Sequence, residues 1–233
     1  MTPEAPRVQN YGTFADDYDS TRYEGPTNTR KEECRRQALL GLLPERTERA
    51  LDVACGTGRG VSLLGSIARV AYGVDGTVEM LRIAQKKLAA GPRAKTLCQG
   101  NAARLPFADA TFDVVTCLNF VHLFPALEEK TAFVREIGRV VRPGGVAVVE
   151  FDSALQGVVL GPMRKYFGKD IGYDWPWVIR GAFPRDLFAI EQVRGTLLPG
   201  LWRGPGLQLL ERGARHFPLN YLATRIFVQA RRK

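Results

Sequence analysis

The sequence has no long hydrophobic run. No window approaches the roughly eighteen uninterrupted apolar residues that a membrane-spanning helix needs. Residues 1–10 also lack the apolar core of a secretory signal peptide. We therefore expect a soluble, cytoplasmic protein. With 233 residues, of which 45% are hydrophobic, the chain can form one α/β domain with a complete core.

Residues that bind metals or form disulfides are scarce. There are two histidines and four cysteines, and no two cysteines form a C-x-x-C pair. This pattern indicates neither a zinc site nor a disulfide framework, so reduced thiols are the simplest interpretation. No set of carboxylates suggests a magnesium site either, and we predict no metal. The cysteines fall on separate predicted elements, at Cys34, Cys55, Cys98 and Cys117.

Two common nucleotide-binding signatures are also missing. Residues 51–58, Leu-Asp-Val-Ala-Cys-Gly-Thr-Gly, are typical of a buried strand that runs into a glycine-rich turn and then a helix. The dinucleotide signature G-x-G-x-x-G would need a glycine where the chain has Val61. No Gly-Lys-Ser/Thr of a phosphate-binding P-loop follows. The turn therefore favours a different ligand, or an ordinary strand-to-helix connection.

The net charge of +9 does not by itself indicate a polyanionic partner. The basic residues are spread along the chain, without a continuous basic stripe that carries interleaved aromatic residues. We expect no nucleic-acid partner. Weak association with an anionic membrane remains open, as does the oligomeric state.

A second strand is predicted at residues 69–74, and it ends at Asp75, 23 positions after Asp52. A carboxylate at the tip of this strand is placed to accept hydrogen bonds from both hydroxyls of a ribose. Asp is also a good helix N-cap, and a helical pattern follows at once. Both roles stay open at this point.

Further along, the order of motifs resembles one family. Asp52, Ala54, Gly56 and Gly58, spaced two residues apart, resemble the first signature of the class I S-adenosylmethionine (SAM) dependent methyltransferases, with Ala54 in place of the usual glycine. A strand at residues 94–99, the loop Gly-Asn-Ala at 100–102 and a fourth strand at 112–118 resemble the adenine-binding part of that family. A helix at 126–141 and a turn at 142–145 then lead to a fifth strand at 146–151. The chain is most similar to the small-molecule type, in particular the ubiquinone-biosynthesis-like group.

The resemblance implies an α/β fold. It predicts a Rossmann-like, mostly parallel sheet of seven strands in the order 3-2-1-4-5-7-6, flanked by helices, with only the last strand antiparallel. Residues 190–198 and 223–230 are the predicted sixth and last strands, with a helix at 207–216 between them. We expect one domain over residues 1–233, with a helical lid at 1–40 and a small substrate cap inserted at 152–185 between strands five and six.

The resemblance also implies which residues bind SAM, whose product is S-adenosylhomocysteine (SAH). Asn101 stands where the family usually has an aspartate, so its contact with adenine lacks charge assistance, and the alternative is an Asn that forms a turn. The predicted cofactor residues are Asp52, Ala54, Cys55, Gly56, Thr57, Gly58, Asp75, Gly76, Met80, Asn101, Ala102, Cys117 and Leu118.

Substrate choice is expected to lie outside this core. Aromatic residues at 11, 14 and 18 share a helical face in the predicted lid, and the cap is rich in aromatics. Both sets favour a small apolar or aromatic acceptor, although structural packing would use the same side chains. The predicted substrate-binding residues are Tyr11, Phe14, Tyr18, Phe124, Trp175 and Trp177.

The predicted activity is transfer of the SAM methyl group to an O, N, S or C atom of that acceptor. The enzyme supplies alignment and excludes water, and it needs a base only if the acceptor must lose a proton. His122, just past the fourth strand, is the first candidate and Tyr18 the second, while a structural His122 is the alternative. Two other functions stay open: a membrane-associated quinone or lipid methyltransferase, and a non-catalytic SAM-binding partner subunit, suggested by the departures at Ala54 and Asn101.

Overall fold

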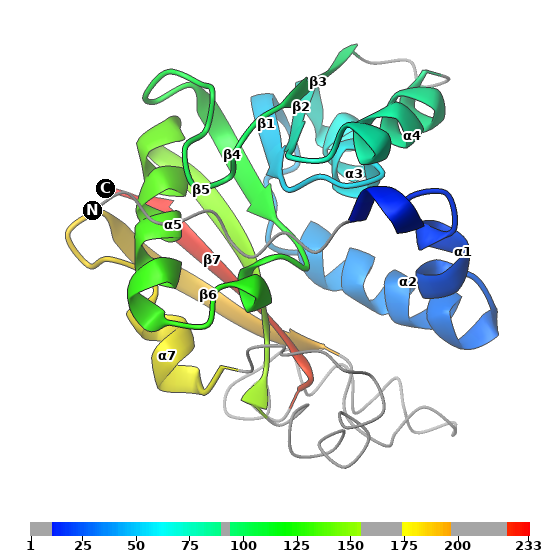
Figure 1. Cartoon of the computed structure of the whole chain (residues 1–233). Coiled ribbons are helices and arrows are strands. Elements are labelled where there is room, and N and C mark those ends of the chain that lie inside the picture. The colour runs from blue at the N-terminus through cyan, green and yellow to red at the C-terminus, as the bar shows by residue number, and fades with distance from the viewer. Residues whose placement is uncertain (1–10, 90–93, 155–173, 197–222) are drawn as a thin grey trace.

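The fold is built around one mixed sheet of seven strands. The computed structural model describes residues 11–89, 94–154, 174–196 and 223–233. The strand order is β3-β2-β1-β4-β5-β7-β6, and β7 is antiparallel to both of its neighbours, as predicted (Figure 1). The strands are β1 (Thr47–Val53), β2 (Ala68–Asp75), β3 (Ala94–Gln99), β4 (Phe112–Cys117), β5 (Val141–Asp152), β6 (Phe188–Thr196) and β7 (Arg225–Arg232).

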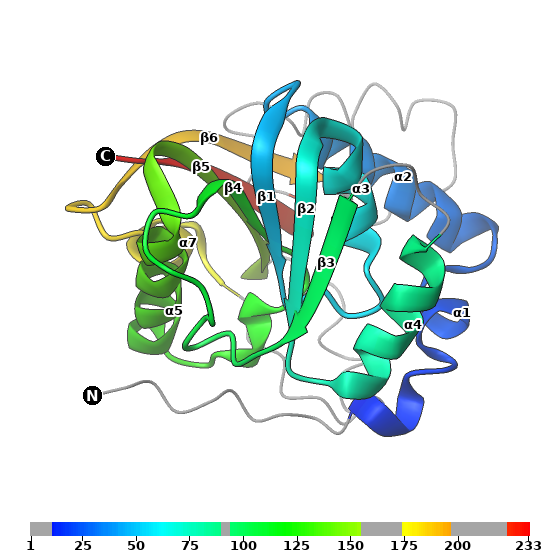
Figure 2. The ribbon, with the colours of Figure 1, turned by 90° about the horizontal axis from the view of Figure 1, so that it is seen from above.

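Helices cover both faces of this sheet. Figure 2 shows α5 and α7 on one side and α2, α3 and α4 on the other. Because both faces are covered, the central strands are buried along most of their length. The helices are η1 (Tyr11–Phe14), α1 (Tyr18–Tyr23), α2 (Pro26–Leu40), α3 (Arg59–Ile67), α4 (Val78–Leu88), η2 (Val121–Leu123), α5 (Leu127–Val140) and α7 (Pro176–Gly181).

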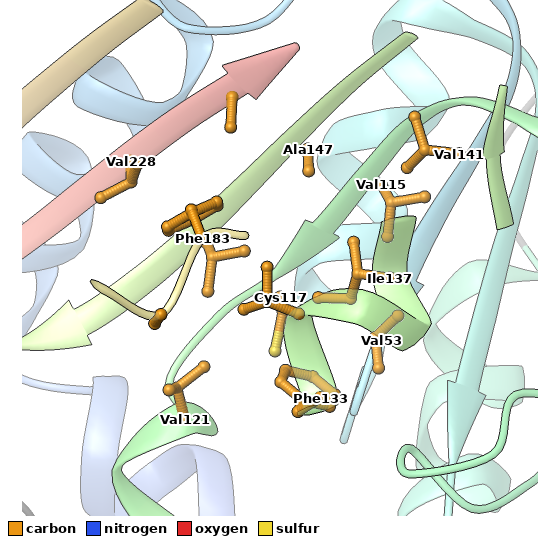
Figure 3. Close-up of a cluster of buried hydrophobic side chains, with 14 of the residues drawn as sticks. Val53, Val115, Cys117, Val121, Phe133, Ile137, Val141, Ala147, Phe183 and Val228 are labelled. Atoms are coloured by element: carbon orange, nitrogen blue, oxygen red, sulfur yellow. The ribbon is translucent and has the colours of Figure 1, made fainter. Parts of the chain in front are cut away.

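Alternation along the strands divides the core between the two faces. On β1, Leu51 and Val53 face the α5 side, while Ala50 faces α3. The larger cluster lies under α5, where Phe133 and Ile137 pack against β4, β5 and β7 (Figure 3). Burial on both faces fixes the strand register, since a slip of one residue would exchange the two sides. Because β1, β2 and β4 are parallel, their carboxyl ends meet at the same edge of the sheet.

The fifth strand begins earlier than predicted. The sequence Arg142-Pro143-Gly144-Gly145 predicts a turn before a strand at 146, yet Val141 already pairs with Phe112 of β4. Regular pairing then shifts and resumes at Val146, and Gly144 takes a positive φ of 76°. The proline and the glycines thus form an irregularity inside β5, because the chain needs extra residues there to stay in the sheet.

The amino-terminal segment is helical, but it is not one helix. The 3₁₀ helix η1 ends at Phe14, and α1 starts at Tyr18 after a turn. The expectation that residues 11, 14 and 18 share one helical face is therefore wrong, since that face needs an uninterrupted helix. The predicted helix at 207–216 and most of the predicted cap lie outside the described residues. Within the part of the chain that the structure describes, no helix has the length and hydropathy needed to cross a membrane.

Candidate functional site

The loop between β1 and α3 is a tight, left-handed turn. Ala54, Gly56 and Gly58 have φ values of 56°, 50° and 84°. At Gly58 a Cβ atom would lie 2.9 Å from the Cβ of Ala84 on α4, so only glycine fits. Ala54 stands where the resembled family usually has a glycine, and it adopts a backbone conformation that favours glycine. An alanine in this conformation is strained. The turn brings the backbone of the loop to the open end of the sheet.

Asp75 holds this loop from the end of β2. Its Oδ2 accepts the N–H of Gly56 over 2.7 Å, and its Oδ1 accepts the N–H of Thr77 over 2.9 Å. Thr77, not Asp75, is the N-cap of α4. Burial raises the pKa of Asp75, while the hydrogen bonds from Thr77 and Gly56 lower it. The hydroxyl of Thr77 and the N–H of Gly76 also lower the pKa of Asp75, so several groups of the neighbouring loops hold this carboxylate.

Asp52 is buried at the end of β1, directly beneath the loop. Its Oδ1 accepts the hydroxyl of Thr116 over 2.7 Å. Burial raises the pKa of Asp52 to about 7, the hydrogen bond from Thr116 opposes this, and the charges of Asp75 and Glu150 raise it further. A Cβ added to Gly60, in the first turn of α3, would lie 2.1 Å from Oδ2 of Asp52. Only a glycine therefore fits where the helix passes this carboxylate.

Two adjoining cavities open above these carboxylates. The Asp75 cavity has a volume of about 530 Å³, and the Asp52 cavity has about 770 Å³. Both are lined by Tyr18, Ala54, Gly56 and Asn119, so they meet at the β1 loop. Of the predicted cofactor residues, the first is also lined by Asp75, Gly76, Met80, Asn101 and Ala102, and the second by Asp52, Cys55, Thr57 and Leu118.

Asn101 has the turn-forming role considered for it, and it lies in the wall of the Asp75 cavity. Its Oδ1 accepts the N–H of Ala103 over 2.9 Å, which is the hydrogen bond of a turn-forming Asn. The residue also lines the Asp75 cavity, next to Gln99 and Gly100. The amide therefore shapes the loop whether or not it contacts a ligand.

Other predicted residues line neither described cavity. Cys117 and Phe124 are buried in the core, where Phe124 stacks on Phe133 at 5.0 Å. Trp175 and Trp177 stack on each other at 5.2 Å and are 49% and 67% exposed. The side chains of Tyr11 and Phe14 lie outside the described residues, as do those of the cap aromatics at 166, 167 and 173. Gly58 shapes the loop from the side of α4.

The amino-terminal helices are fastened over the β1 loop. Asp19 of α1 accepts the hydroxyl of Thr57 over 2.8 Å and pairs with Lys87 of α4. The guanidinium of Arg59 lies over the ring of Tyr23, 3.4 Å from its centre, and also pairs with Glu32 of α2. The sequence predicts a lid here but not these contacts, which join residues 27 to 68 positions apart.

A buried polar layer lies at the ends of β4, β5 and β7. Glu150 Oε2 accepts from Arg35 Nη2 over 2.5 Å and from the Asn119 N–H over 2.9 Å. Arg225 Nη1 donates to Asn119 Oδ1 over 3.2 Å and forms an ion pair with Asp152 Oδ1 over 2.7 Å. Asn119 has a positive φ of 54° and lines both cavities. Sequence reasoning missed it, although its place directly after β4 is a signal that a ligand lies nearby.

His122 lies beside this layer, in η2. Its Nδ1 is 3.2 Å from Oδ2 of Asp152, and its side chain is 10% exposed. It lines neither described cavity, but its neighbours Phe120 and Leu123 line the Asp75 cavity. The predicted candidates for a base are therefore separated, with Tyr18 in the cavity wall and His122 behind it.

The family comparison agrees with this geometry. Residues 51–149, which include the β1 loop, Asp75 and the end of β4, match the family model for a methyltransferase domain. Over these residues, rather less than half of the chain, the sequence matches a methyltransferase domain. The prediction of a class I SAM-dependent methyltransferase is thus confirmed.

Curated relatives match stretches of 136 and 168 residues of this chain. The chain is 35% identical to the demethylmenaquinone methyltransferase of Deinococcus radiodurans over 136 residues, which is 57% of this chain and 55% of that protein. It is 29% identical to the fatty-acid O-methyltransferase of Mycolicibacterium smegmatis over 168 residues, 67% of this chain and 57% of that protein. The chain thus spans little more than half the length of these relatives.

Solved structures share the fold over most of the chain. A possible histamine N-methyltransferase from Thermotoga maritima has a TM-score of 0.68 and 18% identity, and the match covers 96% of this chain and 98% of that one. The SAH-bound magnesium protoporphyrin IX methyltransferase from Synechocystis has a TM-score of 0.67 and 16% identity, with 96% of each chain covered. The predicted Rossmann-like fold is confirmed, and SAM is the cofactor of this family.

Proposed function

We propose that this protein binds SAM across the two cavities and transfers its methyl group to a small apolar acceptor. The observation that carries the proposal is the Asp75 carboxylate. It lies at the end of β2, accepts the N–H of Gly56 from the β1 loop, and lines a cavity of about 530 Å³. A ribose with two adjacent hydroxyls fits this arrangement.

The residues present fit SAM along its length. Asp75 would bind the ribose, and the 99–102 loop with Met80 would enclose the adenine, because both line the same cavity. Asp52 and the loop residues Cys55 and Thr57 line the neighbouring cavity, where a carboxylate suits a cationic group. When bound, SAM supplies an electrophilic methyl group on a sulfonium, which departs as a neutral thioether. The chain itself aligns the acceptor and excludes water.

An apolar acceptor is supported by the named relatives, which methylate demethylmenaquinone or a fatty acid. It is also consistent with Phe120 and Leu123, which line the Asp75 cavity near the end of β4. The acceptor would approach over this edge of the sheet, where Asn119 lies between the two cavities. The non-catalytic alternative would keep the SAM site but show no turnover.

The proposal is tested by calorimetric titration with SAH, with NADH as the control ligand. Wild type should bind SAH and not NADH, and Asp75→Ala should lose at least ten-fold in affinity, since a hydrogen bond to a charged group contributes about 1.5–3 kcal/mol. Asp186→Ala, at an exposed aspartate paired with Arg135, is the matched control and should bind as wild type does. Undiminished affinity in Asp75→Ala would remove Asp75 from the site. Transfer of a radiolabelled methyl group to a 1,4-naphthoquinol or a fatty acid would then exclude the non-catalytic alternative.

A second candidate places the same reaction at a membrane surface. Trp175 and Trp177 stack on each other at the start of α7, and Leu127, which is 36% exposed, lies near Gly181 at the end of that helix. Within the described residues these three are the large apolar side chains that are exposed. An indole has an apolar ring and a polar N–H, and this combination suits a lipid–water interface.

A further inference from the structure

We propose that Asp152 is a positioning residue that fixes His122 in one tautomer and so makes Nε2 of the imidazole the base for the acceptor. The inference rests on the function proposed above and adds a residue pair to it. The pair joins the helix η2, which follows β4, to the end of β5.

Asp152 lies against one ring nitrogen of His122, Nδ1, which leaves the other, Nε2, as the candidate base. Nδ1 of His122 lies 3.2 Å from Oδ2 of Asp152, and the side chains are 10% and 4% exposed. The pair lies at ion-pair distance, and Nδ1 makes no hydrogen bond to a described residue in the structure. Hydrogen bonds of catalytic groups often align only when substrate binds. A carboxylate can only accept, so once aligned it selects the tautomer in which Nδ1 carries the proton, and Nε2 is then the basic nitrogen. Phe120 and Leu123, before and after His122 in the chain, line the Asp75 cavity, and the imidazole itself does not line it.

The surroundings keep Asp152 charged. Burial alone would raise the pKa of Asp152, but Arg225, His122 and Arg35 together lower it below its ordinary value. The guanidinium of Arg225 holds the other oxygen, Oδ1, over 2.7 Å. A buried carboxylate that is ionised and held at both oxygens has a fixed orientation, and this is what a positioning residue requires.

Other charged groups face the pair from neighbouring elements. Asp174, which precedes α7, interacts electrostatically with both Asp152 and His122, and its Oδ1 pairs with Lys130 of α5 at 3.2 Å. Its Oδ2 is buried and has no hydrogen-bond partner among the residues that the structure describes. Glu150 lies on β5 near Arg225 and Arg35. Among these groups Asp152 is the carboxylate that contacts the imidazole directly.

The chemical step is a proton transfer that accompanies methylation. The O–H, N–H or acidic C–H bond of the acceptor breaks, and the proton bonds to Nε2 of His122. The electron pair of that bond stays on the acceptor atom, which takes the methyl group. The imidazolium is stabilised by Asp152 and later releases the proton to solvent. General-base catalysis of this kind typically contributes about 10²–10⁴-fold to the rate.

A purely structural pair would also tie η2 to β5, and the experiment separates the two roles. The sequence has two histidines, His122 and His216, so the side-chain ¹⁵N spectrum of histidine-labelled protein is simple. The His122 signals are assigned from His122→Gln. In the neutral imidazole of wild type, Nδ1 should carry the proton and Nε2 should not. In Asp152→Asn the tautomer should change or become mixed, and Asp152→Glu should restore it.

Turnover is measured on the same variants with whichever probe, 1,4-naphthoquinol or a fatty acid, wild type methylates. Asp152→Asn should lower kcat by about 10²-fold, with the Kd for SAH unchanged within about two-fold, and Asp152→Glu should recover most of kcat. An Nε2–H tautomer in wild type, or a tautomer independent of Asp152, would overturn the inference without any turnover data. A changed tautomer with unchanged kcat would also overturn it. Failure of wild type to bind SAH would instead refute the proposed function.

Discussion

The hydroxyl of Thr57 donates to Oδ1 of Asp19 over 2.8 Å, and this bond joins the amino-terminal lid to the loop after β1. The same carboxylate pairs with Lys87 of α4. Asp19 thus links three segments around the proposed cofactor site, and a bound cofactor would lie beneath the link. The contacts of Arg59 with Tyr23 and Glu32 hold the same helices over the loop.

We expect Asp19→Asn to loosen the lid. Amide hydrogen exchange across α1 should become faster, and SAH should dissociate more quickly, because an amide pairs more weakly with Lys87 than a carboxylate does. Asp16→Asn changes an exposed aspartate three residues nearer to η1 and is the matched control. Equal exchange rates in both variants would show that Asp19 does not hold the lid.

A change at Ala54 tests the strain in the β1 loop. Ala54 has a φ of 56°, where a non-glycine residue is strained by about 1–2 kcal/mol. Ala54→Gly removes that strain but makes the unfolded chain more flexible, at a cost of about 0.4–1 kcal/mol. We therefore expect the free energy of unfolding to stay equal or rise by up to about 1.5 kcal/mol.

The control for that change is Ala71→Gly, at a buried alanine inside β2. Glycine in a strand interior costs about 0.5–1 kcal/mol relative to alanine, before the lost packing is added. Urea unfolding of both variants should thus give effects of opposite sign or very different size. Equal losses in the two variants would contradict a strained Ala54.

The stability of the apo protein should depend on pH through Asp52. Its pKa is raised from 3.8 to about 7, mainly by burial, so the folded state binds this proton more tightly than the unfolded state does. The stabilisation is present at low pH and is lost as pH rises through about 7. Between pH 5 and 8 the free energy of unfolding of wild type should fall by about 2–3 kcal/mol relative to that of Asp52→Asn.

Urea unfolding at pH 5 and pH 8 measures this difference, with Asp16→Asn as the control for loss of an exposed carboxylate. That control should follow wild type at both pH values. A constant difference between wild type and Asp52→Asn across the range would show that Asp52 is already ionised in the folded protein at pH 5.

The exposed tryptophans test the membrane-surface alternative. If the stacked pair contacts lipid, the double variant Trp175→Ala/Trp177→Ala should co-sediment several-fold less with anionic vesicles at low salt. Its affinity for SAH should be unchanged, since neither residue lines a described cavity. Zwitterionic vesicles separate the contribution of charge. If wild type itself does not co-sediment, the alternative is excluded.

Much of the cofactor side of the site could be predicted from the sequence because it is local. The strand, turn and helix that present Gly56 and Gly58 are consecutive in the chain, and Asp75 ends the next strand. The strand order, by contrast, came from the resemblance. The spacing alone left the role of Asp75 open, and the structure separates the alternatives because Thr77 takes the N-cap position.

The polar layer could not be predicted in the same way. Asn119 depends on a positive φ and on Arg225, which is 106 residues away. The repeating pattern of hydrophobic residues along a helix or strand gives no information about a contact between residues so far apart in the chain. Aromatic composition was equally ambiguous: Phe124 and Trp177 carry similar hydrophobicity, yet one is in the core and the other is exposed. Which of them a substrate could reach depends on how the ends of α5 and α7 pack together.

The place of β7 in the sheet sets an order for assembly. The edge strand β6 has β7 as its neighbour, and β7 also supplies Arg225 to Asp152 at the end of β5. During synthesis β6 emerges before the strand that it pairs with, so it must wait for the last described segment of the chain. Closing these long-range pairings is slow compared with forming the local β1–α3–β2 unit. The cofactor loop can therefore take shape early, while the surroundings of His122 are completed last.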